Sequence, residues 1–360
     1  MKALITAGGR GTRLRPLTHT QNKHVLPIAN KPIIFYAIED CVQIGIKDII
    51  ISINKGDTEL PGVVGDGSRW GIHITYQEQD APLGLGFVLK IAEPLIKNDD
   101  FVFYYGDNIF TGGLKKHVQK WKKEGTNFHL CLVKVQDPER FGVALTEKNR
   151  VITTVEKPQN FVSDLAITGI QLYDKNIFEA IKHTKPTPPR AGRTIAEMDI
   201  PPANQWLIDN GFTASYSIIN GWWKDTGKPE SLLSANQLVL ETTKGKIEGV
   251  LNESTIEGKV QVGKGSLIEN SVVRGPVVIG KDCVIKNAYI GPFTAISDSC
   301  EVTECEIENS IVLAHATIHD LTTRLDSSII GCNTSVHSKT TKPMNLNLLL
   351  GDNCAVHIPK

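Results

Sequence analysis

The stretch "MKALITAGGRGTRLRPLTHTQNKHVLP" (residues 1–27) joins a short apolar run to a loop rich in glycine and cations. Its first part, Lys2–Thr6, predicts a buried strand, and the glycines that follow predict a turn. No acidic residue precedes Glu39. A glycine-rich turn lets backbone N–H groups converge on an anion, because no Cβ keeps the anion away. We therefore expect a strand that ends in an anion-binding loop.

The loop matches neither of the two common phosphate-binding fingerprints. No Gly-Lys-Ser/Thr follows a four-residue gap, and the Gly-Gly-x-Gly spacing differs from G-x-G-x-x-G. Arg13 would supply a planar fork for phosphate oxygens and Lys23 a compact point charge. A solvated basic loop without a ligand is the alternative.

Composition limits the partners and the compartment. Lys+Arg and Asp+Glu both number 39 in 360 residues, so no global field favours nucleic acid or an anionic membrane. Seven scattered cysteines without a C-x-x-C pair favour a reducing compartment over a disulfide frame or a zinc site. No signal-peptide core and no membrane span is evident, so we expect a cytoplasmic protein.

The first 240 residues alternate strand-like and helix-like segments. Near-continuous apolar strands are expected at Lys2–Thr6, Asp48–Asn54, 72–77, Phe101–Tyr105 and 128–135, with helices from Pro32, at 84–95 and at 113–124. This order predicts an α/β, Rossmann-like, mostly parallel sheet with helices on both faces. Ligands of such sheets bind beyond the carboxyl ends of the strands, where the glycine-rich loop and Asp107 both lie.

After about residue 245 the helical pattern ends. Units such as "VGKGSL" (262–267) and "IGKDCV" (279–284) place an aliphatic residue every five or six positions. This spacing predicts a parallel β-helix, in which each coil buries one residue per flat face. A sandwich of short strands is the alternative. We expect a catalytic domain at 1–240, a polar linker at 241–248 and a β-helix domain at 248–360.

Six motifs, of which the glycine-rich loop is the first, follow one another in order. "GGRGTRLRPLT" (8–18) with Lys23 and Pro27 precedes "QDAPLGLG" (79–86), "GDN" (106–108), "FGV" (141–143), "EKP" (156–158) and "WWKDTG" (222–227). Together these resemble the sugar-phosphate nucleotidylyltransferases, and most closely the long-form glucose-1-phosphate thymidylyltransferases with a C-terminal left-handed β-helix. The closing run "LLLGDNCAVHI" (348–358) is part of the likeness.

The resemblance implies a reaction in which a sugar 1-phosphate attacks the α-phosphorus of dTTP and releases pyrophosphate. Such chemistry depends on positioning and charge neutralisation, since the nucleophile is already an anion. Arg13 and Lys23 would hold the triphosphate, and Lys157 would meet the sugar phosphate. The nucleotide site implied by the family comprises Gly8, Gly9, Gly11, Thr12, Arg13, Lys23, His24, Gln79 and Gly84.

The resemblance also implies a metal and a sugar site. Asp107 and Asp225 would bind Mg²⁺, an ion that prefers oxygen ligands and relieves the repulsion between two carboxylates. The sugar and its phosphate would contact Asn108, Gly142, Glu156, Lys157, Ile167 and Arg193. Each of these residues also has an ordinary structural interpretation; Asp107, for example, could simply form a strand-end turn.

Four departures from the family pattern bear on specificity. His24 replaces the usual Gln, and "GLGFVL" (84–89) carries Gly86 and Phe87 where Ala and a smaller or polar residue are usual. "DIPP" (199–202) replaces Glu-Ile-Thr-Asp, and the preceding arginine has no in-register match, leaving Arg190 and Arg193 as candidates. We expect retained chemistry with a possible change in the base or sugar that is selected.

Three alternatives stay open. The same chemistry could use UTP or another sugar 1-phosphate. The β-helix could transfer an acetyl group with His315, His319 or His337 as base, or the chain could be an inactive regulatory subunit. In the favoured interpretation the β-helix serves oligomer contacts or regulation, and we expect a homo-oligomer.

Overall fold

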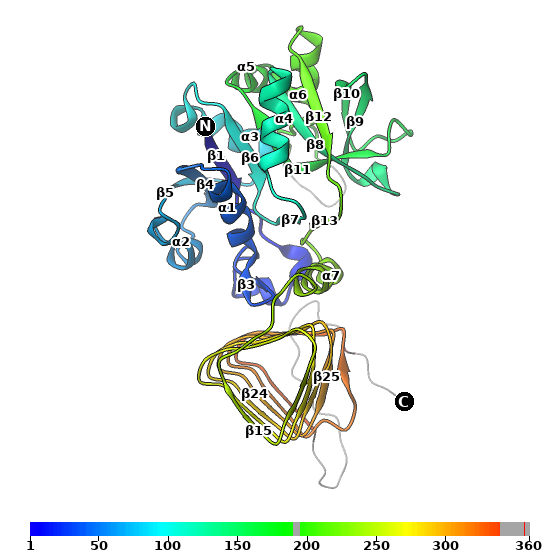
Figure 1. The fold of residues 1–360 in the computed structure, drawn as a ribbon. Coiled ribbons are helices and arrows are strands. Elements are labelled where there is room, and N and C mark those ends of the chain that lie inside the picture. The colour runs from blue at the N-terminus through cyan, green and yellow to red at the C-terminus, as the bar shows by residue number, and fades with distance from the viewer. Residues whose placement is uncertain (190–194, 339–355, 357–360) are drawn as a thin grey trace. The chain divides into compact units, whose positions relative to one another are not determined.

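The computed structural model describes residues 1–189, 195–338 and 356 (Figure 1). Contacts within the chain define two compact units. The first comprises Met1–Arg10 and Ile33–Asp225, and the second comprises Gly11–Pro32 and the chain from Thr226 onward. The sequence patterns placed a boundary between residues 240 and 248, whereas this division by contacts falls directly after Asp225.

The first unit is built on one nine-stranded sheet. Its strand order is β5-β4-β1-β6-β11-β8-β12-β10-β9. The strands are β1 (Lys2–Thr6), β4 (Asp48–Asn54), β5 (His73–Gln79), β6 (Phe101–Tyr105), β8 (Phe128–Lys134), β9 (Gly142–Glu147), β10 (Arg150–Glu156), β11 (Leu165–Tyr173) and β12 (Ala214–Ile218). The first four in spatial order run parallel, as does β8 with β12, whereas β11 runs antiparallel to both β6 and β8.

Helices cover both faces of this sheet, as the apolar strands predicted. They are α1 (Ile33–Gln43), α2 (Glu59–Val64), α3 (Leu85–Ile96), α4 (Lys115–Glu124), α5 (Asn176–His183) and α6 (Pro201–Asp209), with short 3-10 turns at Ser68–Trp70 and Pro138–Arg140. Side chains alternate across each strand. Leu4 and Phe103 therefore share a core with residues of α3, α5 and α6, while Tyr104 faces α1 and donates to Asp40 at 3.0 Å.

A separate two-stranded ribbon joins two segments of the first unit that are far apart in the sequence. β7 (Asn108–Phe110) pairs antiparallel with β13 (Trp223–Asp225). The register places Asp225 opposite Asn108 and Trp223 opposite Phe110. This pairing brings the "GDN" and "WWKDTG" motifs together.

The second unit contains the β-helix. Its three flat faces are visible in Figure 1 and consist of parallel sheets of six, six and five strands. The faces are β14-β17-β20-β23-β26-β29, β15-β18-β21-β24-β27-β30 and β16-β19-β22-β25-β28, running from β14 (Lys246–Ile247) to β30 (Ser335–His337). Equivalent positions on successive coils pair with one another and stack in the interior. Four such buried residues are Val262, Ile279, Ile296 and Val312. These sheets match the expected left-handed parallel β-helix.

The same unit includes residues 11–32 and one helix. Two 3-10 turns (Thr12–Leu14 and Leu17–His19), the short pair β2 (Pro27–Ile28) and β3 (Lys31–Pro32), and α7 (Pro229–Leu240) belong here. The Asn236 side chain of α7 accepts from the Ala29 backbone N–H at 2.9 Å and donates to the Phe293 carbonyl at 2.9 Å. One buried amide thus ties together three segments that are remote in sequence.

One expectation about the chain's organisation needs adjustment, and another falls largely outside the described residues. Lys246–Ile247 already forms β14, so the polar linker is shorter than the predicted 241–248, because the first coil of the β-helix begins inside it. Residues 348–355 and 357–358 of the closing run lie outside the described residues. Within the part of the chain that is described, no helix is long and apolar enough to cross a membrane.

Candidate active site

A pocket of about 210 Å³ opens in the first unit near the carboxyl end of β6. Thr6 and Tyr105 pair at the ends of the parallel strands β1 and β6, so the glycine-rich loop and "GDN" leave the same edge of the sheet. The pocket is lined by Leu85, Tyr105, Asp107, Asn108, Arg140, Phe141, Gly142, Glu156, Lys157, Ile167, Gly169, Gln171, Asp199, Ile200, Pro201, Trp223 and Asp225.

Two carboxylates lie on the wall of this pocket. Asp107 follows β6. Asp225, the last residue of β13, pairs with Asn108 of β7 and so lies on the same wall. The Asn108 side chain is 2 % exposed, and both its nitrogen and its oxygen form hydrogen bonds. Its Nδ2 donates to Asp107 Oδ1 at 2.9 Å, while its Oδ1 accepts from the Gly169 N–H at 3.1 Å and from Trp223 Nε1 at 2.7 Å. The amide therefore orients the Asp107 carboxylate.

A second wall is formed by the "FGV" and "EKP" motifs. Glu156 pairs with Gly142 at the end of the β9–β10 ladder. A Cβ on Gly142 would lie 3.0 Å from Glu156 Oε2 and 2.9 Å from Pro201 Cγ, so glycine makes room for the carboxylate. Lys157 Nζ lies 3.6 Å from Glu156 Oε1, which places a cation and an acid side by side at the pocket.

Lys157 also has an unusual backbone. Its φ of 46° lies in the left-handed region, which non-glycine residues adopt at a cost of about 1–3 kcal/mol. Its N–H donates to the Phe141 carbonyl at 2.9 Å, and this bond helps to hold the conformation. Such strain is typical of residues whose side chains are aimed for function.

Gly8 and Gln79, two predicted nucleotide-binding residues, touch in the first unit. Gln79 ends β5, is 5 % exposed and donates from Nε2 to Asn54 Oδ1 at 3.2 Å. A Cβ on Gly8 would lie 1.7 Å from Gln79 Nε2, so only glycine allows this approach. Gly9 follows as an exposed residue of the loop.

Gly84 and Gly86, at the start of α3, are packed against the backbone of Met198. Gly86 N–H donates to the Met198 carbonyl at 2.7 Å, and Met198 N–H donates to the Leu83 carbonyl at 2.8 Å. A Cβ on Gly84 would lie 2.6 Å from the Met198 oxygen, and one on Gly86 would lie 2.6 Å from Met198 Cγ. The structure thus explains the glycine at 86, while contact of Gly84 with a base stays a prediction.

The remaining predicted residues fall outside this unit. Gly11, Thr12, Arg13, Lys23 and His24 belong to the second unit, where a Cβ on Gly11 would meet Lys23 Cβ at 3.0 Å. His24 is 2 % exposed, and its Nδ1 hydrogen-bonds to Asn22 Oδ1 at 2.8 Å.

Both candidate arginines for the sugar phosphate, Arg190 and Arg193, lie outside the described residues. Within the first unit, the structure gathers Asp107, Asn108, Gly142, Glu156, Lys157, Ile167 and Asp225 around one pocket.

Several pocket residues were missed by sequence reasoning. Tyr105, Arg140, Gln171 and Asp199 line the pocket, and Trp223 orients Asn108. Tyr105 directly precedes "GDN", and Asp199 begins "DIPP", so adjacency to the motifs was an available signal. Gln171 had none, because it lies within an apolar strand.

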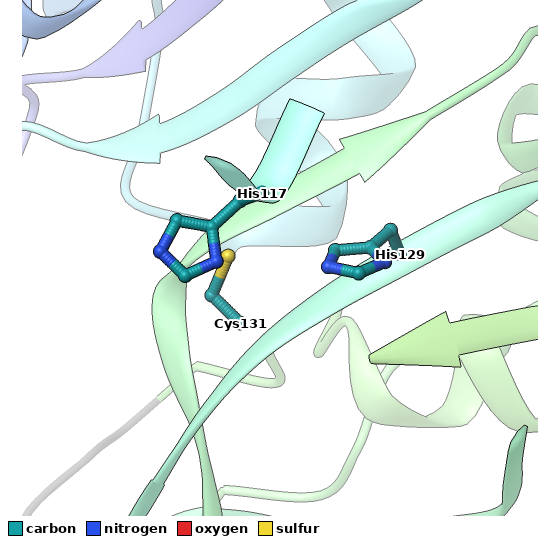
Figure 2. Close-up of side chains that lie close together, drawn as sticks. All are labelled: His117, His129 and Cys131. Atoms are coloured by element: carbon teal, nitrogen blue, oxygen red, sulfur yellow. The ribbon is translucent and has the colours of Figure 1, made fainter. Parts of the chain in front are cut away.

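A second cluster of chemically active side chains lies in the core of the first unit. Figure 2 shows His117, from α4, beside His129 and Cys131, which share one face of β8. Their ligand atoms lie within 4.8 Å of one another, a spacing that could suit a metal ion. However, His129 hydrogen-bonds to the Ser215 and Ser217 hydroxyls at 2.7 and 2.8 Å, and His117 Nδ1 to Ser217 at 2.5 Å. We interpret the cluster as a structural hydrogen-bond network.

Burial controls the protonation of this cluster. It lowers the pKa of His117 to about 4, with smaller effects from Lys116 and Lys120. It lowers the pKa of His129 to about 3, with smaller effects from His117 and Lys120. Burial also raises the pKa of the Cys131 thiol to about 12. All three groups are therefore neutral near pH 7.

Comparisons with known proteins identify the family of this chain. A family model described as "Nucleotidyl transferase" matches residues 2–242. The chain is 41 % identical to a glucose-1-phosphate thymidylyltransferase of Streptomyces griseus, over 99 % of both chains. It is 38 % identical to the low-salt glycan biosynthesis nucleotidyltransferase Agl11 of Haloferax volcanii, over 98 % of this chain and 99 % of that protein.

A solved structure gives the same result. The chain superposes with a TM-score of 0.62 and 36 % identity on a Bacillus anthracis structure assigned to glucose-1-phosphate thymidylyltransferase, with sucrose bound. The match covers 68 % of this chain and 98 % of that one. The family model spans well over half of the chain, and the sequence likeness to Streptomyces and Haloferax proteins runs almost end to end. This chain therefore belongs to the nucleotidyl transferase family.

Proposed function

We propose that this protein is a glucose-1-phosphate thymidylyltransferase that converts dTTP and α-D-glucose 1-phosphate to dTDP-glucose and pyrophosphate. The observation that carries the proposal is the pocket itself, where Asp107 and Asp225 meet Asn108, Glu156 and Lys157. The nearly full-length likeness to the Streptomyces griseus enzyme supports the choice of substrates.

The chemistry requires two anions to meet. A phosphate oxygen of the sugar phosphate attacks the α-phosphorus in line, the bond to the bridging oxygen breaks, and pyrophosphate leaves. The attacking oxygen carries no proton at neutral pH, so no general base is needed. The protein's contribution is orientation and neutralisation of charge. Lys157 would neutralise the sugar phosphate, and its Nζ lies at the pocket 3.6 Å from Glu156 Oε1.

The carboxylates suit a hard divalent cation. Asp107 and Asp225 both line the pocket and offer only oxygen donors, which fits Mg²⁺. When bound, Mg²⁺ would neutralise phosphate charge and polarise the α-phosphate. Asn108 keeps the Asp107 carboxylate oriented toward that task through its 2.9 Å hydrogen bond.

The sugar would be held by groups that pair with its hydroxyls. Glu156 would accept hydrogen bonds from the sugar hydroxyls, Asn108 also lines the pocket, and Gly142 and Ile167 lie in the same lining. The nucleotide would bind through Gly8, Gly9 and Gln79 of the first unit. In the second unit, Gly11, Thr12, Arg13, Lys23 and His24 are the proposed triphosphate-binding residues. Gly84 would contact the base, and Arg193 would hold the sugar phosphate.

The test is pyrophosphate release with Mg²⁺, crossing dTTP, UTP, CTP, ATP and GTP against glucose 1-phosphate and other sugar 1-phosphates. We expect the highest kcat/KM with dTTP and glucose 1-phosphate. UTP should be used less well, by about 10- to 200-fold, since a methyl group in a pocket is worth about 1–3 kcal/mol. Equal or better turnover with UTP would refute the thymidine assignment, and no turnover with any pair would refute the enzyme.

We also propose that the protein works in the cytoplasm as a homo-oligomer. The six cysteines within the described residues are free thiols, which is typical of a reducing compartment. Light scattering on the purified protein tests the oligomer, and a mass equal to one chain at micromolar concentration contradicts it.

A further inference from the structure

Tyr105, the last residue of β6, reaches the pocket because its neighbour across the sheet is a glycine. A Cβ on Gly169 of β11 would lie 2.6 Å from both Cβ and Cγ of Tyr105. Any other residue at 169 would therefore displace the tyrosine ring. The ring is further held by Phe103, whose centroid lies 5.5 Å away in an edge-to-face contact. The position of the Tyr105 side chain is thus set by packing.

The hydroxyl of Tyr105 has a defined direction. Gln171 Nε2 donates to it at 3.2 Å. Gln171 itself is 1 % exposed, and its Oε1 accepts from Asn204 Nδ2 at 3.3 Å. The Tyr173 hydroxyl lies within hydrogen-bonding reach of both Gln171 Oε1 and Asn204 Oδ1. With Oε1 turned toward Asn204, the Gln171 amide presents its Nε2 to Tyr105. The Tyr105 oxygen is then an acceptor toward Gln171, and its own proton is directed elsewhere.

Within the described ranges, no side chain or backbone group accepts that proton. Tyr105 is half-buried and lines the pocket, so a ligand bound there can accept this proton. A tyrosine hydroxyl ordinarily titrates near pH 10, so near neutral pH it carries a proton that it can donate.

We propose that Tyr105 is a substrate-binding residue, and that its hydroxyl donates a hydrogen bond to one oxygen of the sugar ring or its hydroxyls. Gln171 is the positioning residue that orients this donor. The proposal rests on the proposed function, because it takes the ligand of the pocket to be a sugar 1-phosphate. It adds a determinant of sugar specificity that lies outside the "GDN", "FGV" and "EKP" motifs.

The experiment compares the full-length wild type with Tyr105→Phe on glucose 1-phosphate and on its 2-, 3-, 4- and 6-deoxy analogues. We expect Tyr105→Phe to lower kcat/KM for glucose 1-phosphate by about tenfold, as loss of one neutral hydrogen bond does. For one deoxy analogue, the wild type should have a lower kcat/KM than for glucose 1-phosphate. Tyr105→Phe should show no such difference between the two substrates. The KM for dTTP should stay unchanged.

Tyr104→Phe is the matched control. It removes the hydroxyl of the preceding residue, which faces the other side of the sheet and donates to Asp40. Its kinetics should equal those of the wild type. Unchanged kcat/KM in Tyr105→Phe overturns the proposal. A loss that is equal for glucose 1-phosphate and all four deoxy analogues also overturns it, because the variant then keeps the ligand preference of the wild type.

A second variant guards against a folding defect. Gln171→Met keeps the volume and removes the orienting amide, so it should weaken the same deoxy preference while leaving the dTTP KM unchanged. If Tyr105→Phe does not fold, this variant decides the proposal. A wild type without turnover refutes the proposed function instead, and the same comparison of ligands is then made by calorimetric binding.

Discussion

Asp225 lies directly opposite Asn108 in the antiparallel β7–β13 ribbon, and Asn108 Nδ2 donates to the carboxylate of Asp107. One short ladder therefore sets the positions of both acids on the pocket wall. A metal site made of Asp107 and Asp225 would therefore depend on the β7–β13 pairing, and neither motif alone would form it.

Asp225→Asn should lower kcat by about 10²- to 10³-fold, because loss of one carboxylate removes several kcal/mol of charge complementarity for a divalent ion. The measurement is pyrophosphate release over a range of Mg²⁺ concentrations, and the variant should need more Mg²⁺ for half-maximal rate. Asp326→Asn, an exposed residue of the β-helix, is the control. Wild-type activity in Asp225→Asn would contradict the metal assignment.

Trp223→Phe should reduce kcat/KM for the sugar phosphate by about tenfold and destabilise the fold by about 1 kcal/mol. The reason is the lost 2.7 Å hydrogen bond from Trp223 Nε1 to Asn108 Oδ1, which leaves a buried acceptor with one partner fewer. Trp222→Phe is the matched control, since its hydrogen bonds to Thr111 involve only the Trp222 backbone. Equal effects of the two variants would show that Trp223 does not orient Asn108.

Gly86→Ala should raise the KM for the sugar phosphate by about tenfold, because the new Cβ meets Met198 Cγ at 2.6 Å and the Met198 oxygen at 2.9 Å. Relief of this clash would shift Met198 and with it Asp199, which lines the pocket. Gly62→Ala is the control, since nothing lies within 4 Å of the added atom.

Adding Met198→Ala to Gly86→Ala should restore part of the lost activity by removing Cγ. The backbone contact persists, so restoration should be incomplete. Kinetics of Gly86→Ala equal to those of Gly62→Ala would contradict this coupling.

Acid should destabilise the protein through His117 and His129. Their folded pKa values of about 4 and 3 lie below the unfolded value near 6.5, so the unfolded state binds more protons between these limits. This stability is complete above pH 6.5 and is lost as pH falls toward 4, at up to about 1.4 kcal/mol per pH unit for each group.

Denaturant unfolding between pH 7 and 5 tests this expectation. His117→Gln should show a shallower loss of stability with falling pH than the wild type. His315→Gln, at an exposed position, should retain the wild-type slope. Parallel curves for wild type and His117→Gln would contradict the assignment of acid sensitivity to this cluster.

Local patterns predicted the elements better than their pairing. The apolar runs located β1, β4 and β6 at their observed bounds and placed α3 and α4 to within two residues, because periodicity and turn chemistry act between near neighbours. The insertion of β11, antiparallel, between β6 and β8 had no local signal.

The sequence by itself determined the strand and loop at residues 1–27, the coil period of the β-helix and the ordered motifs that identify the family. Only the tertiary structure decided that Asp225 faces Asn108, that Met198 fills the space beside Gly86, and that Gln171 orients Tyr105. Such contacts join residues far apart in the chain. They depend on which side chains fit together in the folded core, and packing of that kind leaves no regular spacing in the sequence.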